Sequence, residues 1–204
     1  IYACARRNEK HKDCRETADL CVSRRKKRLQ GIVFSCFVAS LLLFLLFPQK
    51  KSFEIDFLDV GQGDGIYLCT GGGTSMFIDG GSTDVKQVGK YRILPFLKAK
   101  GVSEISYWFV SHTDTDHVSG LKEVLVSGYR VEYLVFAKAV EKEAKTKELA
   151  ELARSHGTKV LYMQAGDTVR SKRAAMRCLY PKAADKAEDV NDRCLVLQFE
   201  EGDI

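Results

Sequence analysis

The sequence predicts an α/β domain over residues 52–204, with sheets covered by helices on their outer faces, preceded by one membrane-spanning helix over residues 31–47. Two observations predict the domain. Its first strands follow one another closely, as in hairpins, and its later strands alternate with amphipathic helices. A third observation, an uncharged run of 17 residues near the N-terminus, predicts the membrane helix.

Net charge is unevenly distributed along the 204 residues, which carry a formal charge of +5. Residues 1–30 hold ten Lys and Arg against four Asp and Glu (+6), residues 31–51 add two Lys (+2), and residues 52–204 hold 20 against 23 (−3). The basic character therefore belongs to the N-terminal region, and the charge of the domain does not indicate nucleic-acid binding. The seven cysteines include no Cys-x-x-Cys pair, which argues against a structural zinc knuckle.

The run GIVFSCFVASLLLFLLF, residues 31–47, is expected to cross a membrane. As a helix it would be about 25 Å long, at the short end for a hydrocarbon core of about 30 Å. A buried core helix would show a polar face, and this run has only Ser35 and Ser40. A signal peptide would precede a small-residue cleavage site, whereas PQKKSFE follows here.

The charges that flank this run predict its orientation. Five consecutive basic residues, 24–28, precede it, and two follow it within the next turn. The positive-inside rule therefore predicts a basic cytoplasmic segment over residues 1–30 and places residues 52–204 at the outer face of the cell membrane.

Hydrophobic alternation, turn residues and helix-stop residues predict the elements of the domain in order. Glycines 61, 63 and 65 mark a turn after the first strand, Pro95 lies near the start of the first helix, and glycines 101 and 157 end two helices. The expected strands are 53–60, 66–70, 74–78, 105–110, 131–136, 159–163, 176–180 and 195–200, and the expected helices are 90–100, 121–126 and 141–156.

The stretch SHTDTDHVSG, residues 111–120, holds four potential metal ligands on a short loop just beyond a strand: His112, Asp114, Asp116 and His117. Imidazole and carboxylate are the usual non-sulfur ligands of divalent metals. Alternate residues of an extended loop point to one side, so His112 and Asp114 could reach one ion, and Asp116 and His117 a second. Two ions about 3.5–4 Å apart can activate water for displacement at phosphorus. A solvated polar loop is the competing interpretation.

SHTDTDHVSGL resembles the metal-binding motif of the metallo-β-lactamase superfamily, in its His-x-Asp-x-Asp-His form. FLDVGQGDGIYL (57–68), MFIDGG (76–81), ILPFLKAKGV (93–102) and NDRCLVLQF (191–199) surround it in the expected order. Together these stretches resemble the C-terminal hydrolase-like domain of the ComEC family of competence DNA-uptake membrane proteins, over residues 53–204. The resemblance implies a metallo-β-lactamase-like αββα sandwich with a dinuclear site.

The resemblance also assigns roles to residues. His112 and Asp114 would hold one metal, and Asp116 and His117 the other, with Asp116 and Asp64 as the catalytic carboxylates. Asp79 would orient the ligand loop, while Asp59, Gln62 and Asp64 would line the site and Asn191 would face the cleft. A turn held by Gly61 and Gly63, with Asp64 capping it, would explain the DVGQGD stretch equally well.

Three positions depart from the family pattern: Gly65, Ser119 and Cys194 stand where Ala, Gly and Ser are usual. The family continues with a Gly-Asp and a further His motif beyond the position of Ile204. We therefore expect the domain in residues 52–204 to be C-terminally truncated, its metal site incomplete and the fragment alone inactive. Asp114 stands where many relatives have His, and oxygen-rich sites favour Mn²⁺ over Zn²⁺, although Zn²⁺ remains a candidate.

Three functions compete. The first is a membrane-anchored, metal-dependent phosphodiesterase or nuclease that degrades the non-transported DNA strand during competence, alongside other competence proteins. The second is a non-catalytic domain that docks DNA or partners for the uptake channel. The third is another hydrolase of the superfamily, such as a thioesterase or lactonase.

Overall fold

The computed structural model describes residues 25–44, 52–171, 173–182 and 193–202, which fall into two units, residues 1–49 and residues 50–204. The predicted supporting residue Asn191 lies outside the described residues.

The described part of the first unit is a helix, Arg25–Phe44, of 20 residues. It is long and apolar enough to cross a membrane, and its side chains are exposed. The helix starts earlier than expected, because four of the basic residues predicted to precede it, 25–28, form its first turn. The predicted residues 45–47 lie outside the described part of the chain.

The second unit carries two sheets. In the six-stranded sheet, β1, β2 and β3 are antiparallel neighbours and β3 to β6 are parallel, while β7, β8 and β9 form an antiparallel sheet of three strands. The elements are β1 Glu54–Phe57, β2 Gly65–Cys69, β3 Ser75–Asp79, η1 Gly89–Ile93, α2 Leu94–Ala99, β4 Glu104–Phe109, α3 Thr115–Val126, β5 Arg130–Ala137, η2 Lys138–Val140, α4 Ala144–Ser155, β6 Lys159–Met163, β7 Thr168–Ser171, β8 Ala174–Tyr180 and β9 Val196–Glu201.

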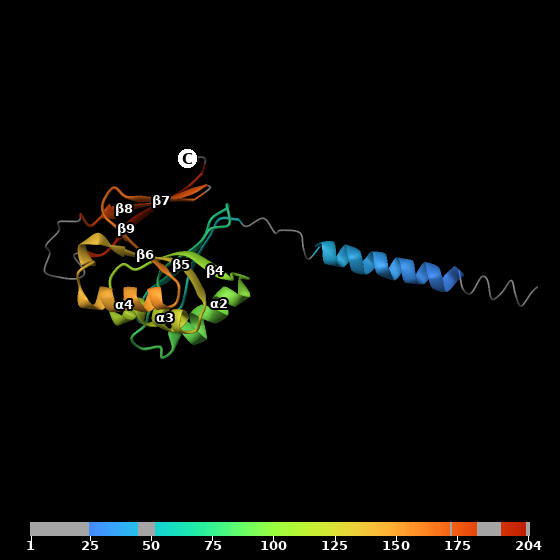
Figure 1. The fold of residues 1–204 in the computed structure, drawn as a ribbon, viewed down its shortest axis with the longest axis horizontal. Helices are drawn as coiled ribbons and strands as arrows, with labels where there is room; N and C mark the ends of the chain where they lie inside the picture. The colour runs from blue at the N-terminus through green and yellow to red at the C-terminus, as the bar shows by residue number, and fades with distance from the viewer. Residues whose placement is uncertain (1–24, 45–51, 172, 183–192, 203–204) are drawn as a thin grey trace, which may run out of the picture. The chain divides into compact units, whose positions relative to one another are not determined.

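The parallel part of the large sheet places its helices on a single face. Strands β3, β4, β5 and β6 are neighbours in chain order, and α2, α3 and α4 connect them. Crossovers between parallel strands are right-handed, so connections that all advance in one direction lie on the same side of the sheet. Figure 1 shows these helices together below β4–β6, with β7–β9 above the same strands.

These layers agree with the predicted α/β fold. A helix layer and two facing sheets are present, which correspond to three layers of the αββα sandwich, and the described residues contain no helix on the outer face of the second sheet. The inner parallel strands β4 and β5 have consecutive buried residues, which matches the near-continuous apolar runs 105–110 and 131–137, whereas the edge strand β6 is half exposed.

The core beneath the site is aromatic. Trp108 of β4 and Phe77 of β3 are fully buried, and their rings stack with centroids 4.3 Å apart. The indole Nε1 of Trp108 donates a hydrogen bond of 2.6 Å to the backbone oxygen of Asp79, so packing in the core fixes the position at which β3 ends. The predicted His and Asp residues lie next to this end of β3.

Candidate metal centre

Helix α3 begins inside the His/Asp motif. The sequence placed all four ligands on a loop, with a helix only from residue 121, but the structure starts α3 at Thr115. Asp114 occupies the N-cap position with extended dihedral angles, and its carboxylate makes no capping hydrogen bond. Asp116 and His117 therefore project from the first helical turn, whereas His112 and Asp114 lie on the short connection after β4.

Backbone hydrogen bonds tie this first turn to the β1–β2 connection. The amide of Asp64 donates to the backbone oxygen of Asp116 at 3.2 Å, and the amide of Gly81 donates to the backbone oxygen of Asp64 at 3.2 Å. The amide of Leu121 donates to the backbone oxygen of Gly80 at 3.1 Å. The DVGQGD stretch and the MFIDGG stretch thus meet at the start of α3.

Two glycines make this approach possible. A Cβ atom added to Gly81 would lie 2.5 Å from the backbone of Asp116 and His117, and one added to Gly63 would lie 2.5 Å from the backbone oxygen of Asp116. Such contacts are impossible for real side chains, and backbone cannot move aside as a flexible side chain can. The glycines are required by close backbone packing around the ligands, which explains the spacing of the DVGQGD stretch in physical terms.

Asp79 connects the end of β3 to the ligand loop. Its carboxylate is buried and accepts hydrogen bonds from the backbone amide of Ser111 at 2.8 Å and from the Ser111 hydroxyl at 2.7 Å. The same carboxylate lies 2.9 Å from Nδ1 of His117. Asp79 has a φ of +57°, a left-handed conformation that Asp adopts more readily than most residues. The predicted role of Asp79, orienting the ligand loop, matches these contacts.

The hydrogen-bond network assigns the histidine tautomers. The carboxylate of Asp79 can only accept, so Nδ1 of His117 carries the proton and donates it. Because the Ser111 hydroxyl already donates to Asp79, Nδ1–H of His112 donates to the Ser111 oxygen at 3.1 Å. Both Nε2 atoms are thereby left with free lone pairs, as metal ligation requires.

The electrostatic field at His117 favours a cation. Burial lowers the pKa of His117, but the hydrogen bond to Asp79 and the charges of Asp79, Asp116 and Asp64 outweigh it, so the pKa of His117 is raised above its ordinary value. The same carboxylates stabilise positive charge of any kind at this position. A field of this sign also favours a divalent metal ion.

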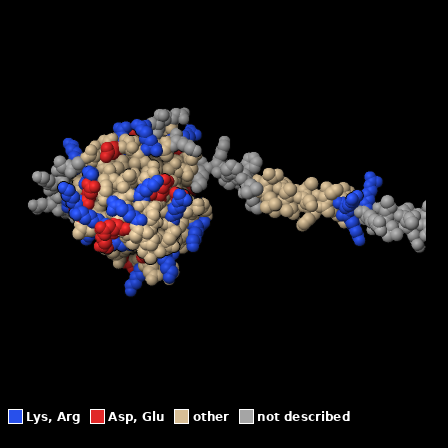
Figure 2. All heavy atoms as spheres, in the orientation of Figure 1, with Lys and Arg blue, Asp and Glu red and all other residues tan. Residues whose placement is uncertain are grey.

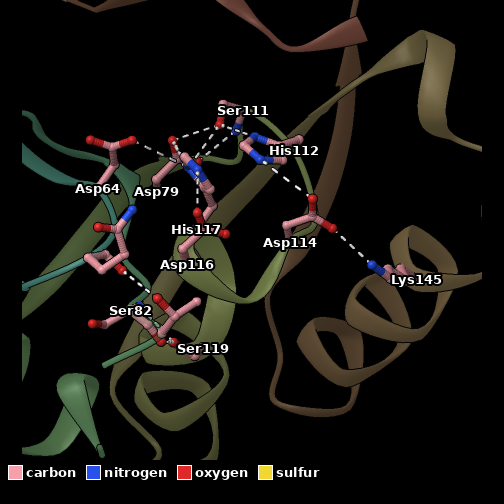
Figure 3. A network of polar contacts seen from close by, with 12 residues as sticks. Asp64, Asp79, Ser82, Ser111, His112, Asp114, Asp116, His117, Ser119 and Lys145 are labelled. Carbon is pink, nitrogen blue, oxygen red and sulfur yellow. Dashed lines mark hydrogen bonds and ion pairs between the residues drawn. The ribbon is translucent and has the colours of Figure 1, made fainter. Parts of the chain in front are cut away.

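Figure 3 shows the side chains converging on His117. Two groups have donor atoms within 4.8 Å of one another: His112 with Asp116 and His117, and Asp64 with Asp79 and His117. The rings of His112 and His117 lie 3.8 Å apart between centroids, and Nε2 of His117 is 3.6 Å from Asp116. Nitrogen and oxygen donors converge at one point, and this donor set fits a divalent ion.

Asp114 lies outside both groups. Its Oδ1 is 2.9 Å from Nζ of Lys145 in the first turn of α4, and its Oδ2 is 3.9 Å from Nε2 of His112. Figure 3 shows the carboxylate extending from the histidines toward Lys145. The hydrogen bond from Lys145 holds the pKa of Asp114 below its ordinary value. The structure thus groups Asp116 with His112, rather than Asp114 with His112 as the sequence suggested.

Of the remaining predicted residues, Asp64 lies beside the cluster, whereas Asp59 and Gln62 have other contacts. Asp64 lies at the exposed side of the cluster, with Oδ2 3.8 Å from Nδ1 of His117. Asp59 is instead 3.5 Å from Arg92 and largely exposed, and Gln62 is held through its backbone amide, which donates to Asp84 at 2.8 Å. For Asp59 and Gln62, the turn interpretation matches the described contacts better than a role in lining the metal centre.

Sequence reasoning missed Ser111, Lys145 and the Ser82–Ser119 pair. The Ser119 hydroxyl donates to the backbone oxygen of Ser82 at 3.1 Å and accepts from the Ser82 amide at 2.9 Å, so this departure from the family's Gly adds a tie between α3 and the Gly80–Gly81 connection. Ser111 could have been suspected because it opens the motif. Lys145 carries no sequence signal, since 31 residues separate it from Asp114.

The second sheet reaches the same loop. The amide of Leu195, just before β9, donates to the backbone oxygen of Ser111 at 3.1 Å. Residues at both ends of the domain therefore fix the segment that carries His112, which makes the position of the ligands a property of the whole fold.

The chain is similar in sequence to two curated proteins. It is 28% identical over 193 residues to ComE operon protein 3 of Bacillus subtilis, which covers 87% of this chain and 25% of the relative. It is 31% identical over 106 residues to Recombination protein 2 of Haemophilus influenzae, covering 51% of this chain and 13% of that protein. The chain thus spans a quarter or less of the length of these relatives. No family model matches it.

Among solved structures, the chain is similar to the metallo-β-lactamase fold protein YhfI from Bacillus subtilis, with 14% identity, a TM-score of 0.46, and coverage of 68% of this chain and 51% of that one. It is also similar to the class B3 di-zinc metallo-β-lactamase LRA-12 from an Alaskan soil metagenome, with 12% identity, a TM-score of 0.48, and coverage of 74% and 56%.

The strands and helices have the arrangement of a metallo-β-lactamase fold, and His and Asp side chains are grouped at one edge of it. The two sequence relatives support a ComEC-like metallo-β-lactamase-fold domain, as the resemblance implied.

Proposed function

We propose that the domain is a metal-dependent phosphodiesterase, a nuclease that cleaves DNA during competence. The observation that carries this proposal is the convergence of His112, Asp116 and His117 within 4.8 Å, with His117 oriented by Asp79. His and Asp ligands of this kind bind divalent ions, of which Mn²⁺ and Zn²⁺ are the candidates. Bound divalent ions supply Lewis acidity, which activates water and offsets the charge that develops on phosphate oxygens.

The residues of the chain would have different roles. Nε2 of His112, Nε2 of His117 and the carboxylate of Asp116 would hold one ion, and Asp64, which is grouped with Asp79 and His117, is the candidate ligand for a second. Asp79 would keep the His117 ring in place and Nδ1 protonated. Asp64 is well placed to pass a proton to solvent, because 64% of its side chain is exposed while the histidines are nearly buried.

DNA would be recognised at the metal centre rather than by a basic surface. Figure 2 shows Lys and Arg interspersed with Asp and Glu on the visible face of the domain, in line with the net charge of −3 over residues 52–204. The helix Arg25–Phe44 would anchor the chain in the membrane, with the basic first turn in the cytoplasm and the domain on the outer face. Other competence proteins are the expected partners there.

The test is cleavage of a single-stranded oligonucleotide by the full-length gene product in detergent, with Mn²⁺ or Zn²⁺. We expect Mn²⁺-supported cleavage that Asp116→Ala abolishes and the control Glu151→Ala, at an exposed position of α4, retains. Cleavage by all three proteins would indicate a contaminant. Cleavage with Zn²⁺ and none with Mn²⁺ would overturn the metal assignment.

A non-catalytic docking domain is the second candidate. The ion pair between Asp114 and Lys145 supports it, because a candidate ligand already paired with an ammonium group is less available to a metal. Absence of metal binding and of cleavage in the same preparation would favour docking. Hydrolysis of thioesters or lactones, with DNA left intact, would favour another hydrolase of the superfamily.

A further inference from the structure

Two aromatic side chains stand exposed around one cavity, apart from the metal centre. Phe57, the last residue of β1, is 78% exposed, and Tyr91 of η1 is 60% exposed. Both line a cavity of about 300 Å³, together with Phe96 of α2. Phe77 and Phe109 in the interior of the sheet are fully buried, whereas the exposed aromatic side chains lie at its β1 edge, where Phe53 is also 47% exposed.

The cavity combines these rings with one cation, Arg92, and two carboxylates, Asp56 and Asp59. The charged atoms of Arg92 and Asp59 lie 3.5 Å apart, with 49% and 85% of their side chains exposed. Asp56 is paired with Lys100 at 3.0 Å, and Lys90, outside the lining, places its ammonium group 4.9 Å from the centre of the Tyr91 ring. The cavity therefore offers aromatic walls with hydrogen-bond donors and acceptors, and its one lining cation is already paired.

This chemistry suits a planar, uncharged ring whose edge carries hydrogen-bonding groups. Bases of single-stranded nucleic acids stack on exposed aromatic side chains and on Arg, whereas bases in a duplex are covered by their neighbours. The one cation of the lining is already paired with Asp59, which argues against a site for phosphate itself, because phosphate would require unpaired cations. A nucleobase could stack on the aromatic walls and form hydrogen bonds through its edge with Arg92 and Asp59.

The β1–β2 connection runs from the cavity to the metal centre. Asp59 lies on its lining, and Asp64, five residues later, lies in the metal cluster. Five residues span at most about 18 Å even when fully extended. A strand with one base in the cavity could thus place a nearby phosphate at His112, Asp116 and His117.

The backbone of η1, which carries Tyr91, packs closely on α3. The Lys90 amide donates to Glu123 of α3 at 3.0 Å, and a Cβ on Gly89 would lie 2.5 Å from the backbone oxygen of Gly120. The helix that carries Asp116 and His117 therefore also supports the turn from which the Tyr91 ring projects. Sites built on packed elements of this kind hold their geometry without a ligand.

We propose that the cavity between Phe57 and Tyr91 binds an unstacked base of single-stranded DNA and so positions the adjacent backbone at the metal centre. This inference rests on the proposed nuclease function and adds the form of its substrate. Phe57 and Tyr91 are positioning residues in this arrangement, since they contact the substrate away from the reacting phosphate.

The test measures binding of two fluorescent oligonucleotides, one of thymidines and one of abasic sites with the same length and charge, to the full-length gene product. EDTA is present, so neither metal binding nor cleavage contributes. We expect the wild-type protein to prefer the thymidine strand, and Phe57→Ser and Tyr91→Ser each to lower affinity for it about tenfold. Affinity for the abasic strand should stay unchanged in both variants. Val126→Ser, at a 64% exposed apolar position at the end of α3, is the matched control.

Equal binding of the two strands by the wild-type protein, or equal losses for both strands in the variants, would overturn the inference. A change in sedimentation of the aromatic variants would also overturn it, because it would show that a second copy covers the pair. Cleavage in Mn²⁺ is measured separately. Base-dependent binding without cleavage contradicts only the nuclease, and cleavage without base dependence contradicts only the base site.

Discussion

The Asp79 carboxylate lies 2.9 Å from Nδ1 of His117, joining the end of β3 to the first turn of α3 across 38 positions of sequence. This contact fixes the His117 tautomer and, through Ser111, the orientation of His112. Partners of metal-ligating histidines typically raise metal affinity without touching the ion. The first prediction follows from this relationship.

Asp79→Asn should lower Mn²⁺ affinity by about 10- to 100-fold, because the uncharged amide no longer enforces a protonated Nδ1 on His117. Asn tolerates the left-handed backbone at φ +57°, so the backbone of the variant should remain unstrained. Isothermal titration of the metal-free protein measures the change. Asp167→Asn, in the turn before β7, is the control, and equal affinities for all three proteins would refute the orienting role.

Lys145→Met should increase Mn²⁺ affinity a few-fold, since the ammonium group 2.9 Å from Asp114 competes with any cation at that carboxylate. The effect should be modest, because 68% of the Lys145 side chain is exposed and exposed ion pairs are weak. Titration in parallel with Lys147→Met, two positions further along α4, separates this contact from the general loss of a positive charge. Lower affinity in Lys145→Met alone would show that the lysine supports the metal centre.

Gly81→Ala should destabilise the domain by about 1–3 kcal/mol or more and weaken metal binding, because the new Cβ would meet the backbone of Asp116 and His117. Gly128→Ala is the comparison. Its φ of +77° imposes strain, but no atom lies within 4 Å of the added Cβ. Thermal unfolding with and without Mn²⁺ should show a metal-linked loss only for Gly81→Ala. Equal effects of both substitutions would remove the proposed role of close backbone packing.

Alkaline phosphatase fused after Ile204 should be active in bacterial cells, because the basic turn at residues 25–28 is expected to keep the N-terminus in the cytoplasm. The fusion should fractionate with membranes at its uncleaved size, which distinguishes a membrane anchor from a signal peptide. A soluble, shortened and active product would support the signal-peptide alternative. Phosphatase inactivity in an intact membrane-bound fusion would reverse the orientation.

The sequence anticipated most of the fold because alternation and helix-stop residues act locally. Strand β6 matches its predicted bounds, and β2, β3, β4, β5 and β8 lie within two residues of theirs. Strand β7 was missed, since four half-exposed residues carry almost no pattern. The start of α3 was placed six residues late because Asp114, an excellent N-cap by type, makes no capping bond and contacts α4 instead.

The sequence predicted which kinds of residue form the candidate site, but only part of how they are arranged in space. The predicted ligands are adjacent in sequence, so a motif can reveal them. Asp79 was identified only through the family resemblance, and Lys145, 31 residues from Asp114, is brought in by tertiary structure. The pairing of His112 with Asp116 depends on α3 beginning at Thr115, because one helical turn moves Asp116 and His117 relative to an extended loop. Whether a stretch such as DVGQGD supplies ligands or packing cannot be read from residue types alone.

His112, Asp116 and His117 are proposed to hold a divalent ion, and anomalous diffraction from crystals of the protein soaked in Mn²⁺ would locate that ion, with His117→Ala crystals as the control. We expect an anomalous peak within about 2.0–2.3 Å of Nε2 of both histidines and of the Asp116 carboxylate, and no such peak in the variant. A peak only at other carboxylates, or none in crystals of the wild-type protein, would contradict it.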